Sequence, residues 1–303
     1  MRSLSFTSFL VYLVSIIPFP VLYLLSDLLY LILYRLIGYR TNVVRENLRN
    51  SFPDWSDGQR REIERKFYRY LPDVILEAIK MRTISAKEMQ RRFRLNNQEE
   101  VVKHLSAGRA IVGVTAHYGN WEWGLHRLSI ATDEPVLIIY KPLTNKTFDR
   151  LFNEMRIRFG AIMVPMKQTL RQLVKYRHTP HISMFVADQS PRYEESDYFT
   201  QFLHQETLVF TGPARVAQRL DAAIVYCHID RVRRGHYACT FTTLTDRPND
   251  YSVHALTDLH NRFTEDIIKR KPELWMWSHR RWKRKPRQGG GQVTPSVTAG
   301  HQA

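Results

Sequence analysis

The chain has 303 residues, 44% of them hydrophobic, which is enough to bury one substantial core with a helical appendage. Its 45 Lys and Arg against 29 Asp and Glu give a net charge of +16 at pH 7, which predicts an anionic partner (a membrane surface, phosphorylated lipid, acidic protein or nucleic acid), with a solvated basic surface as the alternative. Two cysteines in apolar runs, Cys227 and Cys239, exclude a disulfide framework and favour a reducing compartment, and no Cys/His spacing is typical of a metal site.

Residues 4–33 form a nearly uncharged hydrophobic segment. Pro18 and Pro20 are expected to break or kink a helix there; the part before them is shorter than the ~20 residues that cross a bilayer, and the part after them carries Asp27. We therefore expect one kinked anchor that spans the membrane once or lies deep in its interface. A buried helical hairpin of a soluble domain is the alternative, and a removable signal peptide is disfavoured because no small-residue cleavage site follows.

Basic residues follow the anchor at Arg35, Arg40 and Arg45. Because positive charge beside a membrane segment favours the cytoplasmic side, we expect the rest of the chain to face the cytoplasm.

Two helices are expected next. The first covers residues 41–52 and ends before a proline. The second covers residues 59–80, with apolar residues at helical spacing and Ser56 or Asp57 as its N-cap. Pro72 is expected to kink it.

Strand-like and helix-like runs alternate from about residue 95 onward. Strands are expected over residues 110–115, 136–140, 161–164, 181–187, 223–228 and 236–244. Helices are expected over residues 98–106, 121–130, 145–159, 169–176, 212–220 and 253–269. This alternation indicates an α/β fold with a mainly parallel sheet flanked by helices. The expected segments are a membrane anchor (1–38), a basic helical segment packed on the α/β domain (39–94), the α/β domain itself (95–285) and a disordered Gly/Pro/Ser/Thr-rich tail (286–303).

One motif lies where the first of these strands ends. The apolar run 110–115 is broken by Tyr118–Asn120, and a helix is expected to begin at Trp121. His117 therefore lies on a strand-to-helix loop, where catalytic groups are often positioned, and Glu122 lies in the first turn of the helix. A histidine with a carboxylate five residues on suits a general base whose ring the carboxylate orients, so that one ring nitrogen takes a proton from a hydroxyl.

The same spacing occurs a second time, at His260 and Glu265. This pair lies inside an expected helix, where an offset of five points the side chains to different faces, so we interpret it as a surface coincidence. Because about one such match is expected by chance, the first pair depends on its strand–loop–helix context. The alternative there is a loop histidine beside an unrelated glutamate.

Several further motifs occur in the order and spacing of a known family. They are Arg45–Pro53, Glu77, His117–Glu122, Tyr140–Pro142 with Asn145, Arg156–Gly160, Ala187–Gln189, Phe210–Ala214 and Trp275–Lys283. With them the chain resembles, from about residue 10 to 285, the lipid A biosynthesis lauroyl/myristoyl acyltransferases of the lysophospholipid and glycerol-3-phosphate acyltransferase superfamily. The family usually has arginine where this chain has Lys141.

The resemblance implies an O-acyltransferase of lipopolysaccharide biosynthesis at the inner membrane of Gram-negative bacteria. The implied reaction moves a fatty acyl chain from an acyl carrier protein thioester, or from acyl-CoA, to a hydroxyl of a phosphorylated lipid A precursor. It implies no metal and no cofactor besides the thioester. An acidic carrier protein suits the net positive charge.

The resemblance makes His117 the base and Glu122 its orienter. Backbone N–H groups near Gly119 and Asn120, at the positive end of the expected helix, are candidates for holding the oxyanion.

The other candidate residues are expected to bind substrate: Arg156, Arg158, Asp188, Lys141 and Asn145. Arg156 and Arg158 are expected to meet phosphate on the acceptor or on the donor's phosphopantetheine arm, with ordinary salt bridges as the alternative. Asp188 follows a buried strand, and the resemblance places it at the site, pairing an arginine; a turn or cap is the alternative.

Other functions stay open. The same chemistry on an aminolipid, a glycolipid or a lysophospholipid is one, and a non-catalytic, membrane-tethered lipid-binding protein is another. Nucleic-acid binding is disfavoured because no known binding module is present. Trp275, Trp277 and Trp282, which lie among basic residues, are expected either at the membrane interface or in the core.

Overall fold

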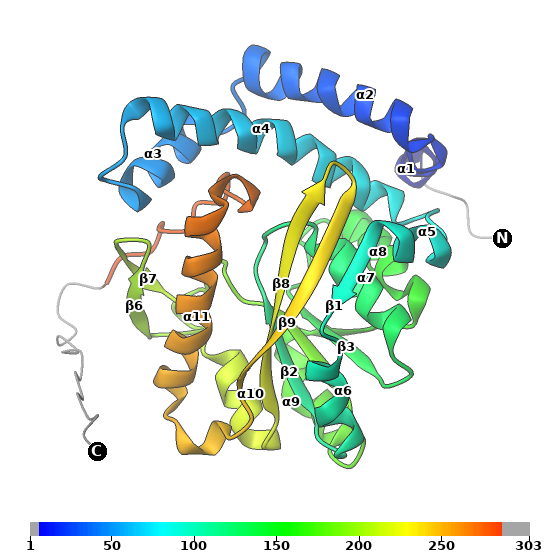
Figure 1. Ribbon diagram of the computed structural model, residues 1–303, viewed down its shortest axis with the longest axis vertical. Coiled ribbons are helices and arrows are strands. Elements are labelled where there is room, and N and C mark those ends of the chain that lie inside the picture. Colours follow the sequence, from blue (N-terminus) through cyan, green and yellow to red (C-terminus); the bar gives the residue numbers. More distant parts are fainter. Residues whose placement is uncertain (1–5, 287–303) are drawn as a thin grey trace.

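The computed structural model describes residues 6–286, so nearly all of the expected disordered tail (286–303) lies outside the described residues. A seven-stranded sheet with the order β1-β9-β8-β2-β5-β3-β4 forms the centre (Figure 1). Its strands are β1 (Phe93–Asn96), β2 (Ile111–Thr115), β3 (Val136–Tyr140), β4 (Ile162–Pro165), β5 (Ile182–Val186), β8 (Ala223–Arg233) and β9 (His236–Thr245). Neighbouring strands pair in parallel except in the β8–β9 hairpin, which confirms an α/β fold with a mainly parallel sheet.

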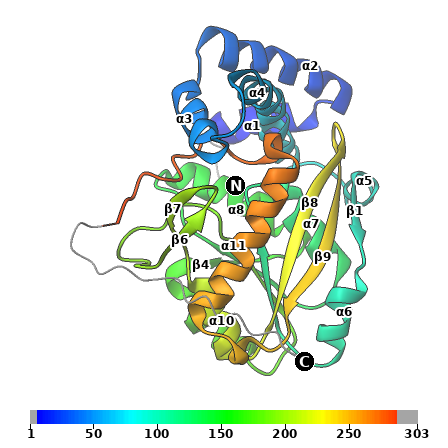
Figure 2. The same cartoon turned by 60° about the vertical axis from the view of Figure 1, so that its left-hand side comes forward.

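Helices cover both faces of the sheet (Figures 1 and 2). On one side lie α10 (Gly212–Leu220), α11 (Val253–Arg270) and the small hairpin of β6 (Phe199–Phe202) and β7 (Gln205–Leu208). On the other side lie α5 (Ala86–Arg92), α6 (Glu99–Ser106), α7 (Trp121–Ala131) and α8 (Lys146–Arg156), while α9 (Thr169–Leu173) follows β4. Side chains of β2 alternate between the two layers: Val112 and Val114 belong to the hydrophobic cluster that contains Leu256 of α11, and Ile111 belongs to the cluster that contains Trp123 of α7.

The expected strands and helices of the α/β region are present, with ends shifted by a few residues; β8, which continues to Arg233, differs most. Helix α5, strand β1 and the two strands of the β6–β7 hairpin were not expected. The strand β1 has the sequence Phe-Arg-Leu-Asn, too short and too polar to stand out, and it forms by pairing with β9 at the sheet edge. Cys227 and Cys239 are buried, unbonded residues of β8 and β9.

Two basic helices precede the sheet, α3 (Thr41–Ser51) and α4 (Asp57–Lys80). The Ser56 hydroxyl accepts a hydrogen bond from the Gln59 N–H, and the Gln59 side chain accepts one from the Ser56 N–H, which confirms Ser56 as the cap. The helix α4 runs through Pro72 to Lys80 and covers the loop that follows β2.

The N-terminal segment forms α1 (Phe6–Ile16), α2 (Phe19–Tyr30) and a π-helical extension (Leu31–Leu36). The stretch Phe19–Leu36 is long and apolar enough to cross a membrane, with a mean hydropathy of 1.5, and only 22% of it is buried. It lies across α4 at one end of the molecule (Figures 1 and 2).

Polar contacts bind these helices to the domain. Asp27 pairs with Arg234 at 2.8 Å, and the Ser26 hydroxyl donates to Asp73 at 2.5 Å. Lys80 donates to carbonyl oxygens at the end of α1, each at 2.7 Å. Asp27, the residue that fits a membrane span least well, is therefore explained by its ion pair with the β8–β9 turn.

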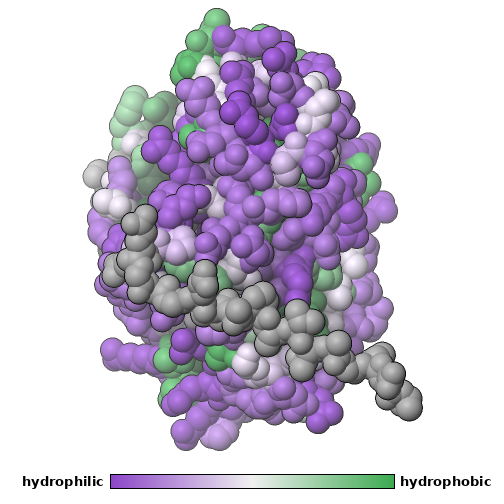
Figure 3. Space-filling model, turned by 90° about the vertical axis from the view of Figure 1, so that its left-hand side faces the viewer, coloured by the Kyte–Doolittle hydropathy of each residue, from purple (hydrophilic) through white to green (hydrophobic). Residues whose placement is uncertain are grey.

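The outer faces of α1 and α2 remain exposed and apolar. The exposed residues are Phe6, Phe9, Leu10, Tyr12, Leu13 and Ile16 of α1 and Val21, Leu24, Leu25 and Leu28 of α2, and Leu31 follows α2. On the face drawn in Figure 3, which is mainly hydrophilic, hydrophobic residues gather toward the upper edge, the end of the molecule where α2 lies in Figure 1. Exposed apolar residues in this number, on two helices that both pack on α4, indicate a site of interaction.

Candidate active site

The loop between β2 and α7 carries the candidate base. Asn120 caps α7: its side-chain oxygen accepts a hydrogen bond from the Trp123 N–H at 3.0 Å. Gly119 has a φ of +58°, and a Cβ there would lie 2.3 Å from the carbonyl oxygen of Ile229, so this turn requires glycine. The tight, capped turn fixes the position of His117.

His117 is held by Asp188. Its ring Nδ1 lies 2.6 Å from Asp188 Oδ1, and its backbone N–H donates to the same oxygen at 3.0 Å. The other carboxylate oxygen accepts the Trp275 indole N–H at 2.7 Å. Burial alone would raise the pKa of Asp188, but the charge and hydrogen bonds of His117, with the bond from Trp275, lower that pKa to about 2. An ionised acceptor at Nδ1 favours the tautomer that leaves Nε2 able to take a proton.

Sheet topology explains this pair. The strands β2 and β5 are parallel neighbours, with Thr115 opposite Val186, so the residues beyond their carboxyl ends meet at one edge of the sheet. His117 and Asp188 each follow the last residue of their strand by two positions. Asp188 was expected at the site pairing an arginine, but it pairs with His117, because the strand order that brings the two together is not evident from the sequence.

Glu122 does not orient His117, which corrects the expectation from the motif. It is 4% exposed and forms a bidentate ion pair with Arg156, whose Nε lies 2.9 Å from Oε2 and whose Nη2 donates to Oε1. Burial would raise the pKa of Glu122, but the Arg156 guanidinium outweighs it and holds the pKa below its usual value. Arg156 on α8 thus binds the Glu122 carboxylate, while Asp188 binds Nδ1 of the His117 imidazole.

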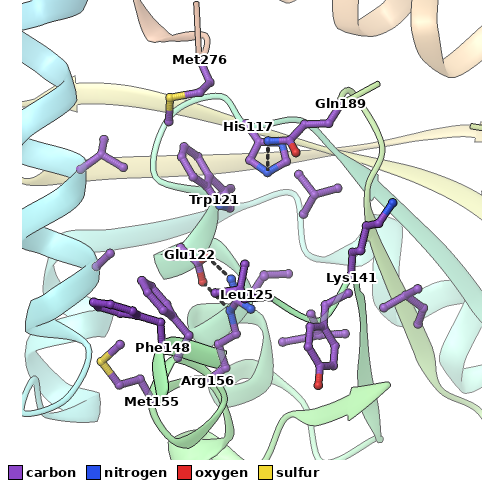
Figure 4. A pocket seen from close by; sticks show the side chains of 18 of the residues that line it. His117, Trp121, Glu122, Leu125, Lys141, Phe148, Met155, Arg156, Gln189 and Met276 are labelled. Atoms are coloured by element: carbon purple, nitrogen blue, oxygen red, sulfur yellow. Dashed lines mark hydrogen bonds and ion pairs between the residues drawn. The ribbon is translucent and has the colours of Figure 1, made fainter. Parts of the chain in front are cut away.

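A cavity of about 630 Å³ opens beside these groups (Figure 4). Its polar lining includes His117, Glu122, Lys141, Arg156 and Gln189. Most of the wall is apolar: Val11, Val74, Ile75, Ala78, Ile79, Trp121, Leu125, Ile138, Ile139, Leu143, Phe148, Leu151, Phe152, Met155, Met166, Val186, Phe210 and Met276. An apolar cavity with a few convergent polar groups is typical of a small-molecule or lipid site. Its wall includes residues of α1 and α4, so the N-terminal segment helps to build it.

The Gln189 side chain was not assigned a role from the sequence, although it lies in one of the matched motifs. Its amide nitrogen lies 3.1 Å from Nε2 of His117 (Figure 4), whereas Asp188 contacts the other ring nitrogen, Nδ1. With Nδ1 protonated, Nε2 accepts the Gln189 amide N–H, so a substrate hydroxyl has to replace Gln189 in order to donate to Nε2.

Of the three remaining residues expected to bind substrate, one lines the cavity and two do not. Lys141 lines it and pairs with Glu195 at 2.6 Å. Asn145 instead caps α8, where its side chain accepts from the N–H groups of residues 147 and 148. Arg158 lies outside the lining and donates to the carbonyl oxygens of Met81 and Ile84. Both expectations are corrected: Asn145 binds backbone N–H groups at the start of α8, and Arg158, in the 3-10 turn after α8, binds backbone carbonyl oxygens.

Comparison with known proteins gives a family match over nearly the whole chain. Residues 3–284 match the family described as bacterial lipid A biosynthesis acyltransferase. The chain belongs to this family. It is 23% identical over 278 residues to the lipid A biosynthesis lauroyltransferase of Escherichia coli K12, covering 91% of this chain and 89% of that protein. It is 22% identical over 272 residues to the palmitoleoyltransferase of the same organism, covering 89% and 87%, and 22% identical over 237 residues to a lipid A biosynthesis acyltransferase of Haemophilus influenzae, covering 76% and 72%.

One of the expected oxyanion donors of this acyltransferase, the Gly119 N–H, is already engaged. The Gly119 N–H donates to the Leu274 carbonyl oxygen at 3.1 Å. Within the described residues, the side chain of Asn120, unlike its backbone N–H, is engaged: it is fully buried and donates to Glu77 at 2.7 Å while capping α7. This corrects the sequence-based assignment for the Gly119 N–H, because the sequence did not reveal that the segment around Leu274 takes up this donor.

The carboxyl-terminal motif of the acyltransferase, residues 275–283, packs in the core and contacts the segment that follows β5. Trp275, Trp277 and Trp282 are at most 9% exposed, which decides for core packing over the membrane interface. His279 Nε2 accepts the backbone N–H of Ser190 at 3.3 Å, next to Gln189. Burial lowers the pKa of His279 to about 4, so this imidazole is neutral at pH 7 and can act as that acceptor.

The second His-x4-Glu match lies away from the site. His260 is not on the surface, as was expected, but is 1% exposed in the packed face of α11. Glu265 accepts the Leu203 N–H at 3.1 Å and pairs with Lys269, so the two side chains have different surroundings. Within residues 6–286, no three His, Cys, Asp or Glu side chains are grouped so as to hold a metal ion.

Proposed function

We propose that this acyltransferase is a membrane-bound enzyme that moves a fatty acyl chain from an acyl carrier protein thioester to a hydroxyl of a phosphorylated lipid A precursor. The observation that carries the proposal is the His117–Asp188 pair at the wall of an apolar cavity. The cavity offers a place for an acyl chain, and Nε2 offers a base within it.

The proposed reaction begins when the acceptor hydroxyl replaces the Gln189 amide as the donor to Nε2 of His117. The hydroxyl oxygen attacks the thioester carbonyl carbon while its proton passes to Nε2, and Asp188 stabilises the imidazolium that forms. The tetrahedral intermediate collapses, the carbon–sulfur bond breaks, and the thiolate takes the proton from Nε2. The products are an ester and a free thiol, so the reaction needs no cofactor besides the thioester.

Arg156 and Gln189 are the proposed donors to the oxyanion, because both line the cavity with His117. Arg156 is fixed by its ion pair with Glu122, which preorganises a positive charge as oxyanion catalysis requires. This assigns to Glu122 the positioning of Arg156.

Charge beside the cavity supports an anionic substrate. Lys141 lines the cavity, and Arg284 donates to the hydroxyl of Ser190, another lining residue, at 3.2 Å. Lys283 lies near four other cations: Arg284, Lys141, Arg192 and Arg280. Burial lowers the pKa of Lys283, and the charges of these neighbours lower it further. We propose that this cluster, rather than Arg158, meets the phosphate of the acceptor or the acidic carrier protein.

The exposed apolar faces of α1 and α2 support attachment to the inner membrane, with the catalytic domain on the cytoplasmic side. Because α2 is bound to the domain through Ser26 and Asp27, we favour helices that lie in the bilayer interface over an independent span.

The test is acyl transfer by the purified full chain from acyl carrier protein or CoA thioesters to a panel of lipid acceptors, read by mass spectrometry. We expect a lipid A precursor to gain the mass of one acyl chain. His117→Ala should lower turnover about 10²–10⁴-fold, the contribution of a general base, while His178→Ala, at an exposed histidine outside the cavity lining, should leave it unchanged. Transfer only to an aminolipid, glycolipid or lysophospholipid would overturn the acceptor, and an active His117→Ala variant would overturn the base.

A further inference from the structure

A buried carboxylate that the reaction does not use joins four parts of the molecule. Glu77 of α4 is 0% exposed. It accepts hydrogen bonds from the Tyr23 hydroxyl of α2 at 2.8 Å, the Tyr237 hydroxyl of β9 at 2.7 Å and the Asn120 side-chain amide at 2.7 Å. Its carbonyl oxygen also accepts the Trp123 indole N–H at 2.8 Å. One side chain thus connects the apolar N-terminal helix to the start of α7.

The connection ends at the catalytic loop. Asn120 lies three residues after His117 and caps α7, so the bond from Glu77 fixes the turn that places the imidazole. The Tyr70 hydroxyl, also from α4, donates to the Gly119 carbonyl oxygen in the same turn. The layers therefore run in order from α2 through α4 to the loop, as Figures 1 and 2 show for the helices.

We propose that Glu77 is a positioning residue that connects the His117 loop to α2 by hydrogen bonds. The way α2 packs on the domain then sets the rate of acyl transfer. The outer face of α2 is apolar and exposed, while Tyr23 points its hydroxyl inward to Glu77. A change at the outer surface of α2 is passed to the loop through two hydrogen bonds, Tyr23 to Glu77 and Asn120 to Glu77. The proposal rests on the function proposed above, in which His117 is the base.

Glu77, Tyr23 and Asn120 lie outside the lining of the cavity. Their replacement should therefore change turnover more than substrate binding. A catalytic group misplaced by about 1 Å loses about 10²-fold in rate, so a partial loss of order in the loop is expected to lower kcat by about tenfold.

The experiment compares Tyr23→Phe with Tyr68→Phe in the full chain. Tyr68 is buried on the same helix as Glu77, and its hydroxyl donates to the Tyr39 carbonyl oxygen at 2.5 Å, so it also ties the N-terminal segment to α4 but does not reach the loop. Both variants lose one hydroxyl from one hydrogen bond. We expect both to lose thermal stability, but only Tyr23→Phe to lower kcat about tenfold with KM changed less than about twofold.

The variant Glu77→Gln tests the path between the two ends. If Tyr23 acts through Glu77, the double variant Tyr23→Phe/Glu77→Gln has the same kcat as Glu77→Gln alone. Equal kcat for Tyr23→Phe and Tyr68→Phe, or additive losses in the double variant, would overturn the proposal.

Hydrogen exchange of residues 117–124 gives a readout that does not need the reaction. Tyr23→Phe should speed exchange in this loop and Tyr68→Phe should not. Unchanged exchange in Tyr23→Phe overturns the coupling even if the enzyme is active. Faster exchange in a protein that transfers no acyl chain supports the coupling and overturns only the proposed function.

Discussion

Two buried carboxylates near the cavity act through different partners. Asp188 faces the imidazole of His117, and Glu122 faces the guanidinium of Arg156. The sequence motif pairs Glu122 with His117, but in the folded protein Asp188 is the acid that contacts the imidazole. Substitutions at the two positions should therefore fail in different ways.

For Asp188→Asn we expect kcat to fall about 10²–10⁴-fold, because an amide in place of the carboxylate no longer selects the productive tautomer or stabilises the imidazolium. For Glu122→Gln we expect kcat to fall as well. This variant should also lose about 3 kcal/mol in the free energy of unfolding, because Arg156 is left as a poorly compensated buried charge. Steady-state kinetics and urea unfolding of both variants check this. A larger loss of stability in Asp188→Asn than in Glu122→Gln would contradict the assignment.

The low pKa of Asp188 makes a prediction for stability in acid. Because the pKa lies at about 2 in the folded protein and at 3.8 ordinarily, the unfolded chain binds the proton first as the pH falls. The stabilisation, about 2 kcal/mol, is complete above pH 3.8 and is lost as the pH falls through 2. The wild-type free energy of unfolding should therefore fall more steeply between pH 5 and 2 than that of Asp188→Asn. Parallel curves would show that Asp188 is not held in this way.

At the scale of elements, α1 and α2 have two unlike faces. The inner faces carry Ser15, Ser26 and Tyr30, which are buried, and the outer faces carry exposed leucines and phenylalanines. This arrangement accounts for an apolar helix that also contains an aspartate. It favours attachment in the plane of the membrane surface.

The double variant Leu24→Glu/Leu28→Glu tests this face. The two leucines are 69% and 53% exposed, so the fold should survive their replacement. Each substitution should remove the free energy gained when the leucine side chain is buried in lipid. We expect binding to anionic phospholipid vesicles to weaken about 100-fold. The control is Leu170→Glu/Val174→Glu, at 56% and 55% exposure in and just after α9, away from α2, which should bind as the wild type does. Equal weakening in both would show that α2 is not the docking face.

At the scale of the whole molecule, the net charge of +16 acts on association with the donor. An acidic carrier protein is drawn to a positive surface, and salt screens this attraction. We expect kcat/KM for acyl carrier protein thioesters to fall about tenfold between about 0.05 and about 0.5 M salt. For an uncharged acyl-pantetheine thioester kcat/KM should change little. The same salt dependence for both donors would exclude electrostatic recruitment of the carrier.

The sequence by itself determined the α/β class, most elements of the sheet, the apolar N-terminal segment and the loop that presents His117, because these depend on local patterns of apolar residues and turns. Only the tertiary structure decided which acid meets the imidazole, since Asp188 reaches it through the pairing of β2 with β5, 71 residues along the chain from His117. It also decided that Arg158 and Asn145 hold backbone and that the Gly119 N–H is taken by Leu274. Hydrogen-bond partners that lie far apart in sequence are fixed by strand order and helix packing, and neither is encoded in the spacing of a motif.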